Sequence, residues 1–393
     1  MEGVRQSPTD PDFVQNPYPF YARARALGDI VFWEEYWIPV ATSHRAVTSI
    51  LKDRKMGRAP LAPPAIPPHL AAFYAVEAHS MLELEPPRHT RLRGLVLRAF
   101  TSRRIAALET ETMALCHTLI DGFPDGAFDL LQTYAQRLPV IVIARLLGVP
   151  ETMCDQLLAW SNAMVAMYQA RRTRAIEDAA AHATQEFSDF LRTYVQERRA
   201  KPADDLITHL IAAEEDGEKL STDELTTTCI LLLNAGHEAT VHTLGIAVKS
   251  LLETGTQHTA LAPDRIDATV EEVMRHDPPL HMFTRYVYED TSLFGTDLKR
   301  GDQVGCLLGA ANRDPAVWPD PDRFDPWRKQ STHAAFGAGL HFCVGAPLAR
   351  LELKLGLAAL FARCPTLAFA APPRYANLYH FHGLEALQVT QDA

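Results

Sequence analysis

Residues 336–345 read FGAGLHFCVG and lead directly into an apolar-periodic segment. Gly337 and Gly339 permit a tight turn, which brings backbone amides close to a neighbouring group. A helix that begins after Gly345 directs free N–H groups and a partial positive charge at Cys343. Such surroundings stabilise the thiolate, which is the form of cysteine that binds metal. The stretch therefore predicts a metal-binding cysteine at position 343.

Several kinds of site can be compared with this loop. His341 and Cys343 could form half of a zinc site, but no second Cys/His pair has finger-like spacing. The glycines do not form G-x-G-x-x-G, so a dinucleotide fold is not supported. A single thiolate ligand favours haem, in which cysteine supplies electron density for O–O cleavage. We expect core residues with free thiols at the other cysteines, which are Cys116, Cys154, Cys229, Cys306 and Cys364.

The ten residues 336–345 resemble the haem-ligand signature of the cytochrome P450 monooxygenases, and the order of other motifs extends the resemblance over nearly the whole chain. The resemblance implies haem b, with Cys343 as the axial thiolate ligand of the iron. It implies a mainly α fold with small peripheral sheets, in one domain over 1–393, with the haem between a distal and a proximal helix. The implied reaction inserts one oxygen atom from O2 into a small hydrophobic or aromatic molecule.

The spacing of apolar residues agrees with a mainly helical chain. It predicts helices over 89–100, 105–121, 129–147, 153–170, 176–199, 204–214, 222–254, 267–277 and 346–363. Strand-like pieces predict a hairpin over 29–42 and further strands within 284–310 and 366–390. Two proline-rich stretches, 59–70 and 312–328, are expected to be irregular. A capping box, Ser221 to Glu224, marks the start of the longest helix.

The middle of that helix, LLLNAGHEATVH at 231–242, resembles the distal helix that crosses the face of the haem where oxygen binds. Gly236 leaves room for dioxygen, and Glu238 provides an acid for the protons that oxygen activation consumes. In the family a threonine usually follows this acid, but here Ala239 takes its place and Thr240 comes one residue later. One residue along a helix is a rotation of about 100°. We therefore expect the side chain of Thr240 to point away from the haem.

Two hypotheses account for the missing hydroxyl. Ordered water, or a hydroxyl or carbonyl group of the substrate, replaces it in proton delivery. Alternatively, peroxide serves as the oxidant and makes the relay partly dispensable. A non-catalytic haem-thiolate sensor is a third interpretation, and the retained Glu238 and Gly236 speak against it.

The resemblance also assigns haem contacts. The matching positions are His89, Arg93, Arg285 and His341 for the two carboxylates, and Phe336, Gly337 and Gly345 in the loop. It further implies a buried charge network of Glu272, Arg275 and Arg323.

Substrate contacts are expected from apolar residues around the haem, which favour a hydrophobic or aromatic ligand. These candidates are Leu82, Leu232, Ala235, Met282, Phe283 and Phe381.

Charge and hydropathy restrict the partners. The net charge of −10 argues against nucleic acid. No apolar run of about 18 residues predicts a membrane span, and no signal peptide is evident, so we expect a cytoplasmic protein. The stretch 88–104 contains six arginines and no acid. It is interpreted either as a solvated helix face or, by the resemblance, as the docking site of a separate acidic ferredoxin that supplies electrons.

Overall fold

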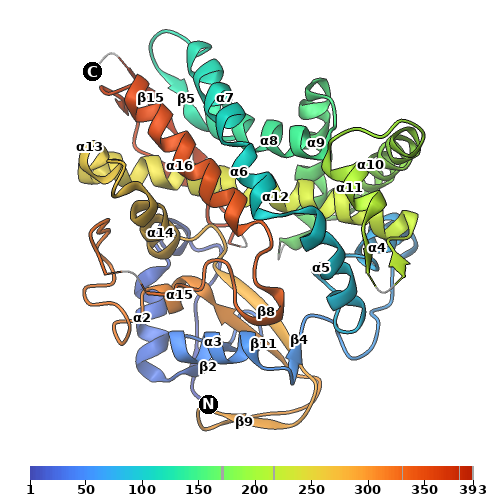
Figure 1. Ribbon diagram of the computed structural model, residues 1–393. Helices are drawn as coiled ribbons and strands as arrows, with labels where there is room; N and C mark the ends of the chain where they lie inside the picture. The colour runs from blue at the N-terminus through green and yellow to red at the C-terminus, as the bar shows by residue number, and fades with distance from the viewer. Residues whose placement is uncertain (170–171, 216, 330, 380, 392–393) are drawn as a thin grey trace. The chain divides into compact units, whose positions relative to one another are not determined.

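The computed structural model describes residues 1–393 except 170–171, 216, 330, 380 and 392–393. Helices dominate and the sheets are small, which confirms the predicted fold class (Figure 1). The chain divides into two units. Unit 1 comprises Met1–Leu61, Met113–Gln136 and Ala239–Ala393, and unit 2 comprises Ala62–Thr112 and Arg137–Glu238. The single domain expected over 1–393 stays a prediction. Across the described residues, no helix has both the length and the hydropathy that crossing a bilayer requires.

The helices are α1 Pro11–Gln15, α2 Tyr18–Leu27, α3 His44–Lys52, α4 Ala71–Glu77, α5 Arg88–Ala99, α6 Ser102–Ala107, α7 Glu109–Asp121, α8 Arg137–Leu147, α9 Cys154–Val165, α10 Arg174–Ala200, α11 Leu206–Ala212, α12 Thr222–Thr254, α13 Gln257–Ala260, α14 Ile266–His276, α15 Leu308–Asn312 and α16 Ala346–Arg363. The strands are β1 Gly3–Val4, β2 Ile30–Trp33, β3 Ile38–Ala41, β4 Met56–Gly57, β5 Phe128–Asp129, β6 Glu214–Glu215, β7 Glu218–Lys219, β8 Met282–Val287, β9 Thr291–Leu293, β10 Thr296–Leu298, β11 Gln303–Leu307, β12 Ala368–Phe369, β13 Arg374–Tyr375, β14 Leu384–Ala386 and β15 Gln388–Thr390.

The main sheet of unit 1 has the strand order β1-β2-β3-β11-β8-β4. Its β2–β3 hairpin is antiparallel, as predicted for 29–42, and β11 pairs antiparallel with β8. Helices α3 and α15 lie beside β11 and β8 (Figure 1). Val47 and Ile50 of α3 share one buried core with Val287 and Val304 of the sheet. Burial of this apolar face fixes β8, which carries three of the candidate site residues.

The helical part of unit 1 supports the cysteine loop. Helix α16 packs against α14 (Figure 1). The bounds of α16 agree with the predicted helix over 346–363. The hydroxyl of Tyr134 donates to the carbonyl oxygen of Gly356 in α16 at 2.8 Å. The helix that follows the cysteine loop is therefore anchored near its middle.

Unit 2 is a helical assembly in which α9 and α10 pack along one another. The ring of Trp160 stacks on Phe187 with centroids 5.0 Å apart. The predicted capping box at the start of α12 is confirmed: Ser221 N donates to Glu224 Oε2 at 3.0 Å, and Glu224 N donates to Ser221 Oγ at 3.2 Å. These reciprocal bonds satisfy two backbone donors and fix the first turn of α12.

The structure differs from the sequence prediction in several helices. The helix predicted over 129–147 is interrupted, because Pro139 has no N–H for the carbonyl of Ala135. Residues Leu131–Ala135 form a short π-helix, after which Gln136 N donates to Leu131 O. Helix α3 was not predicted, although its Ser43 cap and the spacing of Val47, Ile50 and Leu51 carry the signal. The helix predicted over 105–121 is also divided, into α6 and α7.

Candidate active site

The cysteine loop of unit 1 is closed by its own backbone. Cys343 N donates to the carbonyl oxygen of Phe336 at 3.0 Å. Gly337 and Gly339 have φ of 69° and 70°, the left-handed region that favours glycine. A Cβ at Gly339 would overlap the carbonyl oxygen of Leu51. The predicted tight turn is therefore confirmed, and its two first glycines are required for backbone geometry.

The thiol of Cys343 lies close to the start of α16. Gly345 is the residue that precedes the helix, and a Cβ there would lie 3.8 Å from Cys343 Sγ. The first turn of an 18-residue helix presents free N–H groups and a partial positive charge. Negative charge on Sγ is favoured at such a position, which is what a thiolate ligand needs.

Burial distinguishes Cys343 from the other cysteines. All six are free thiols, and only Cys343 is partly exposed. Burial raises the pKa of Cys116 and Cys154 to about 11, and that of Cys229 and Cys306 to about 12. Such thiols stay protonated at neutral pH and are inert. The prediction that these cysteines are core residues is confirmed.

An ion pair braces the loop from the side. Arg350 of α16 bonds Glu271 of α14 through Nε at 2.5 Å and Nη2 at 3.0 Å. His333 Nε2 lies 3.2 Å from the same carboxylate, and the guanidinium of Arg350 lies 4.5 Å from the ring centroid of Phe336. Although burial by itself would raise the pKa of Glu271, hydrogen bonds from Arg350 and His333 lower it to about 2. Sequence reasoning did not find this brace.

The buried charge network is present, but one of its predicted members is wrong. Glu272 and Arg275 form a bidentate pair at 2.7 and 2.8 Å, with side chains 1% and 3% exposed. The second arginine is Arg328, whose Nε lies 3.4 Å from Glu272 Oε1. Arg323 contributes its carbonyl oxygen, which accepts from Arg275 and from Arg328. Both arginines lie in the irregular stretch 312–328, and the sequence pattern does not show which of them turns inward.

Two of the candidate haem contacts in unit 1 are basic. Arg285 of β8 is 3% exposed, and its Nη1 donates to the carbonyl of Thr284 at 2.9 Å. His341 lies in the loop and is half-buried, whereas Phe336 and Gly337 are buried. Unit 1 therefore holds the thiol and two cationic or donor groups that suit a carboxylate.

The other two basic candidates lie on α5 of unit 2. His89 is 1% exposed and Arg93 is half-buried. Their spacing of four residues places both on one face of this helix. The prediction that the two side chains face the same way is confirmed, and their contact with a haem stays a proposal.

The distal segment lies within α12, which is helical without a break from Thr222 to Thr254. In unit 2, a Cβ at Gly236 would lie 3.4 Å from Cγ1 of Ile143. His237 Nε2 lies 3.4 Å from Glu238 Oε2, and His237 Nδ1 lies 2.9 Å from Leu233 O. Glu238 is partly exposed, with 20% of its side chain accessible. The acid is thus beside a buried imidazole that sequence reasoning did not single out.

The residues after the acid belong to unit 1. Ala239 is partly exposed and Thr240 is 5% exposed. The side chain of Thr240 lies near Glu352 of α16, and burial raises the pKa of this carboxyl well above its usual range. The hydroxyl of Thr243 donates to the carbonyl oxygen of Ala239 at 2.7 Å. Of the two threonine side chains that follow Ala239, that of Thr243 thus bonds the backbone of its own helix, and that of Thr240 is buried near Glu352.

The candidate substrate contacts differ in exposure. In unit 1, Met282, Phe283 and Phe381 are half-buried. Leu280 and Phe381 form an isolated antiparallel bridge, and the ring of Phe381 lies 5.9 Å from His242.

In unit 2, Leu82 is half-buried, Leu232 is 6% exposed and Ala235 is exposed.

The last segment of unit 1 has one position without space for a side chain. Gly383 is buried, and a Cβ there would overlap Nδ1 of His242. Gly383 directly follows His382, and the backbone N–H of His382 donates to the carbonyl oxygen of Pro279 at 2.8 Å. This close approach ties the C-terminal segment to the residues that lead into β8.

The donor set fits a haem with a thiolate ligand. Cys343 supplies sulfur at a helix N-terminus, and soft thiolates suit iron. Arg285 and His341 of unit 1, and His89 and Arg93 of unit 2, are the kinds of group that bind carboxylates.

Comparison with known proteins gives consistent results. The family model "Cytochrome P450" matches residues 140–258 and 265–368. The chain is 37% identical to the cytochrome P450 monooxygenase PikC of Streptomyces venezuelae, over 96% of this chain and 92% of that protein. It is 37% identical to a vitamin D(3) 25-hydroxylase of Pseudonocardia autotrophica, over 91% of this chain and 89% of that protein. A solved structure of P450 BioI in complex with a fatty-acid-ligated acyl carrier protein superimposes with a TM-score of 0.91, at 32% identity, over 96% of this chain and 99% of that one.

Proposed function

The chain belongs to the cytochrome P450 family and is a haem-thiolate monooxygenase, and we propose that it oxidises a hydrophobic organic molecule whose own hydroxyl or carbonyl group assists proton delivery. When bound, the haem supplies the activation of dioxygen and the transfer of one oxygen atom. The observation that carries the proposal is the middle of α12, where Glu238 is followed by Ala239.

We propose that Cys343 is the axial ligand and that basic residues hold the two haem carboxylates. Charge-assisted hydrogen bonds to a carboxylate are about twice as strong as neutral ones. The proposed donors are His89, Arg93, Arg285 and His341. The buried position of Arg285 and the shared helix face of His89 and Arg93 support this assignment.

Proton delivery is assigned to Glu238. Its partly exposed carboxylate can exchange protons with solvent, and Nε2 of His237 lies 3.4 Å from it. The hydroxyl of Thr243 donates to the Ala239 carbonyl, and the side chain of Thr240 is buried near Glu352. We therefore assign the role of the missing hydroxyl to the substrate, with ordered water as its link to Glu238.

The substrate is proposed to be largely apolar. The half-buried candidates Met282, Phe283 and Phe381 of unit 1 and Leu82 of unit 2 offer apolar surface, which favours hydrophobic ligands. The name of the vitamin D(3) 25-hydroxylase relative supports hydroxylation as the reaction type to test first.

We propose that electrons come from a separate acidic ferredoxin that binds the arginine-rich stretch 88–104. Within unit 2, Arg91 pairs with Glu218 and Glu224, and Arg104 approaches Asp204 at 3.8 Å. The exposed arginines that support this proposal are Arg88, Arg98 and Arg103.

Ionic strength tests the electron partner. Because surface charges are screened by salt, reduction by an acidic ferredoxin should slow as salt is added. The double variant R98E/R103E should slow reduction at low salt, whereas the exposed R300E of unit 1 should not. Reduction rates that are indifferent to salt and to R98E/R103E would refute this docking site.

We also propose a cytoplasmic location. The six free thiols support it, because reducing compartments keep cysteines unpaired. Fractionation of the producing cells, with thiol labelling before lysis, measures it directly.

The experiment for the substrate has two stages. Titration of the haem protein with hydrophobic molecules, followed through the haem absorbance band, identifies a ligand that enters the distal side. Product per electron is then measured with the hydroxyl-bearing ligand and with its deoxy analogue, in the wild type and in Ala239→Thr. A positioned proton-transfer group contributes about 10²–10⁴-fold, so loss of the substrate hydroxyl should lower product per electron at least about tenfold in the wild type.

In Ala239→Thr the deoxy analogue should recover most of this loss. If the deoxy analogue is oxidised equally well by both proteins, substrate assistance is refuted. Equal turnover with peroxide in the absence of any ferredoxin would instead identify a peroxygenase.

A further inference from the structure

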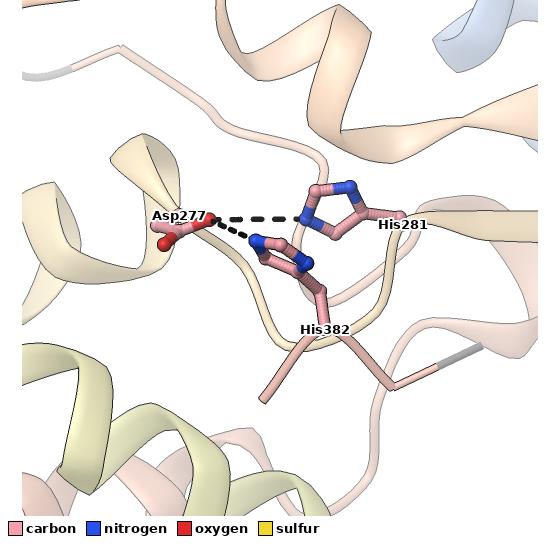
Figure 2. Close-up of side chains that lie close together, drawn as sticks. All are labelled: Asp277, His281 and His382. Atoms are coloured by element: carbon pink, nitrogen blue, oxygen red, sulfur yellow. Dashed lines mark ion pairs between the residues drawn. The ribbon is translucent and has the colours of Figure 1, made fainter. Parts of the chain in front are cut away.

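A second cluster of metal-binding side chains lies within unit 1 and shares no residue with the cysteine loop. Its members come from three separate segments: Asp277 follows α14, His281 precedes β8, and His382 lies between β13 and β14 (Figure 2). Their side chains are 7%, 0% and 5% exposed, respectively. Buried carboxylates and imidazoles are rare unless they are paired or bind metal.

The three side chains converge on one point. Asp277 Oδ1 lies 3.8 Å from His281 Nε2 and 3.5 Å from His382 Nε2, and the three ligand atoms all lie within 4.8 Å of one another. Figure 2 shows both imidazoles directing Nε2 at the same carboxylate. In a tetrahedral zinc site, ligand atoms lie about 2.0–2.2 Å from the ion and roughly 3.3 Å apart. The cluster is slightly wider than this, and a small inward movement of the two rings closes it around an ion.

One atom of the cluster lacks a hydrogen bond. Among the described residues, His281 Nε2 is buried with no hydrogen-bond partner. Its distance of 3.8 Å to Asp277 Oδ1 is too long for a hydrogen bond. Leaving a buried polar atom unsatisfied is unfavourable. Coordination of a cation would satisfy this atom.

Tyrosines hold the imidazoles in position. Tyr21 Oη lies 2.8 Å from His281 Nδ1 and 2.9 Å from the hydroxyl of Tyr379. The ring of Tyr375 stacks on His382, with centroids 4.0 Å apart and planes at 11°. A metal-bound histidine is usually fixed through its second nitrogen, which sets its tautomer and orientation. The contact of Tyr21 with Nδ1 supplies this for His281.

The carboxylate is held in the same way. Tyr18 Oη donates to Asp277 Oδ1 at 2.5 Å, and the hydroxyl of Tyr375 donates to Oδ2. A carboxylate oxygen has two lone pairs, so Oδ1 can accept from Tyr18 and still coordinate an ion. Metal-binding carboxylates are commonly hydrogen-bonded by such outer groups.

The protonation state of the imidazoles is compatible with metal binding. Burial lowers the pKa of His382 to about 3 and also lowers the pKa of His281. Both rings are therefore neutral at pH 7, and neutral imidazole is the form that binds metal. Arg313, whose guanidinium lies over the ring of Tyr18, and Lys249, whose ammonium lies over the ring of Tyr375, are positive charges that oppose a cation here. The carboxylate of Asp277 supplies negative charge against them.

We propose that Asp277, His281 and His382 bind one divalent transition-metal ion, with zinc as the expected ion. Two nitrogens and one carboxylate oxygen form a donor set that zinc accepts readily. Because the three side chains are buried, the ion is structural and is acquired as the chain folds. The ion links the C-terminal segment to the end of α14 and the start of β8.

Metal analysis of the haem-loaded protein tests the proposal. The chain is produced in zinc-supplemented medium and purified without a metal-binding tag, and zinc is measured per haem by mass spectrometry. We expect about one zinc per haem in the wild type and in the control His276→Gln, whose imidazole contacts the Asp322 carbonyl instead. His281→Gln and His382→Gln should each retain less than a fifth of this zinc. Because the ratio is taken per haem, variants that fold poorly do not distort it.

X-ray absorption at the zinc edge gives an independent measurement. Nitrogen and oxygen neighbours at about 2.0–2.2 Å are expected, and a sulfur shell at about 2.3 Å would place the ion on cysteines instead. A wild-type protein with less than a tenth of an equivalent of zinc overturns the proposal. Full zinc retention by both glutamine variants overturns it equally.

Discussion

The cysteine loop at 336–345 and the middle of α12 at 234–240 both contain small residues, and we propose a role in the reaction for both, but they are held differently. The loop closes on itself through the bond from Cys343 N to Phe336 O and is braced by Arg350. The middle of α12 is regular helix, in which Gly236 and Ala239 leave side-chain space. The protein's own contacts thus specify the loop, whereas in our proposal the helix leaves part of its chemistry to a ligand.

Removing the ligand atom should have the largest effect. Cys343→Ser replaces sulfur with a hydroxyl that is a poor ligand for haem iron, so the thiolate spectrum and all monooxygenase turnover should disappear. The spectrum of the reduced, carbon monoxide-bound protein measures this. Cys364→Ala, at a buried free thiol, is the control and should behave as the wild type. A thiolate spectrum in Cys343→Ser would mean that another cysteine is the ligand.

The buried charge network of Glu272, Arg275 and Arg328 offers a matched pair of variants. Arg328→Met leaves Glu272 with one partner fewer and removes bonds to the carbonyls of Asp320 and Arg323. Breaking a buried pair costs about 3–5 kcal/mol. Arg323→Met, which keeps the backbone carbonyl, should cost about 0.5 kcal/mol or less. Urea unfolding measures both free energies, and equal losses would restore Arg323 as the inward arginine.

The acid of α12 should have an effect on turnover rather than on folding. Glu238→Gln removes the ionisable group, so product formation should fall about 10²-fold while haem content stays normal. Glu253→Gln is the control, since this residue pairs with Lys249 near the end of the same helix. Product formation under saturating substrate measures both. Unchanged turnover in Glu238→Gln would remove this residue from the proton path.

Low pH should weaken the ion pair between Glu271 and Arg350 that braces the cysteine loop. The pKa of Glu271 is lowered from 4.5 to about 2, so its ion pair stabilises the fold above about pH 4.5 and this contribution disappears as the pH falls toward 2. The group is partly exposed, so solvent screening limits the contribution to about 1 kcal/mol or less. Glu271→Gln should therefore be less stable than the wild type at pH 6 and equal to it near pH 2. Parallel stability curves for the two proteins over this range would refute the assignment.

The smallest effect is expected at the position that departs from the family pattern. Because the substrate supplies the hydroxyl in our proposal, Ala239→Thr should change product per electron with the native substrate by no more than about twofold. The ratio of product to consumed electron donor measures this. A sharp improvement in product per electron would show that the substrate does not supply the hydroxyl that is missing at position 239.

The same contrast explains what could be predicted from the sequence. The bounds of α12 and α16 were predicted correctly, because a capping box and the glycines of the loop are local signals. The third member of the charge network was wrong, because two arginines in an irregular stretch have no periodicity to separate them. Thr240 and Glu352 are far apart in sequence, and only the packing of the helices shows that their side chains lie near one another.

The cluster of Asp277, His281 and His382 was missed for a similar reason. Its members lie in three segments with no motif spacing between the first two and the third. The backbone contact of His382 with Pro279 and the bridge between Leu280 and Phe381 bring the C-terminal segment to the start of β8.

Gly383 has a consequence for laboratory evolution. A Cβ at this position would overlap the ring of His242, so a mutation here is tolerated only if that ring moves. Phe381, two residues earlier, is half-buried and is one of the proposed substrate contacts. In a randomised library selected for new substrates, we expect active clones to diversify at position 381 and to keep the parental glycine codon at position 383. The C-terminal segment thus combines an evolvable position with a fixed one two residues away.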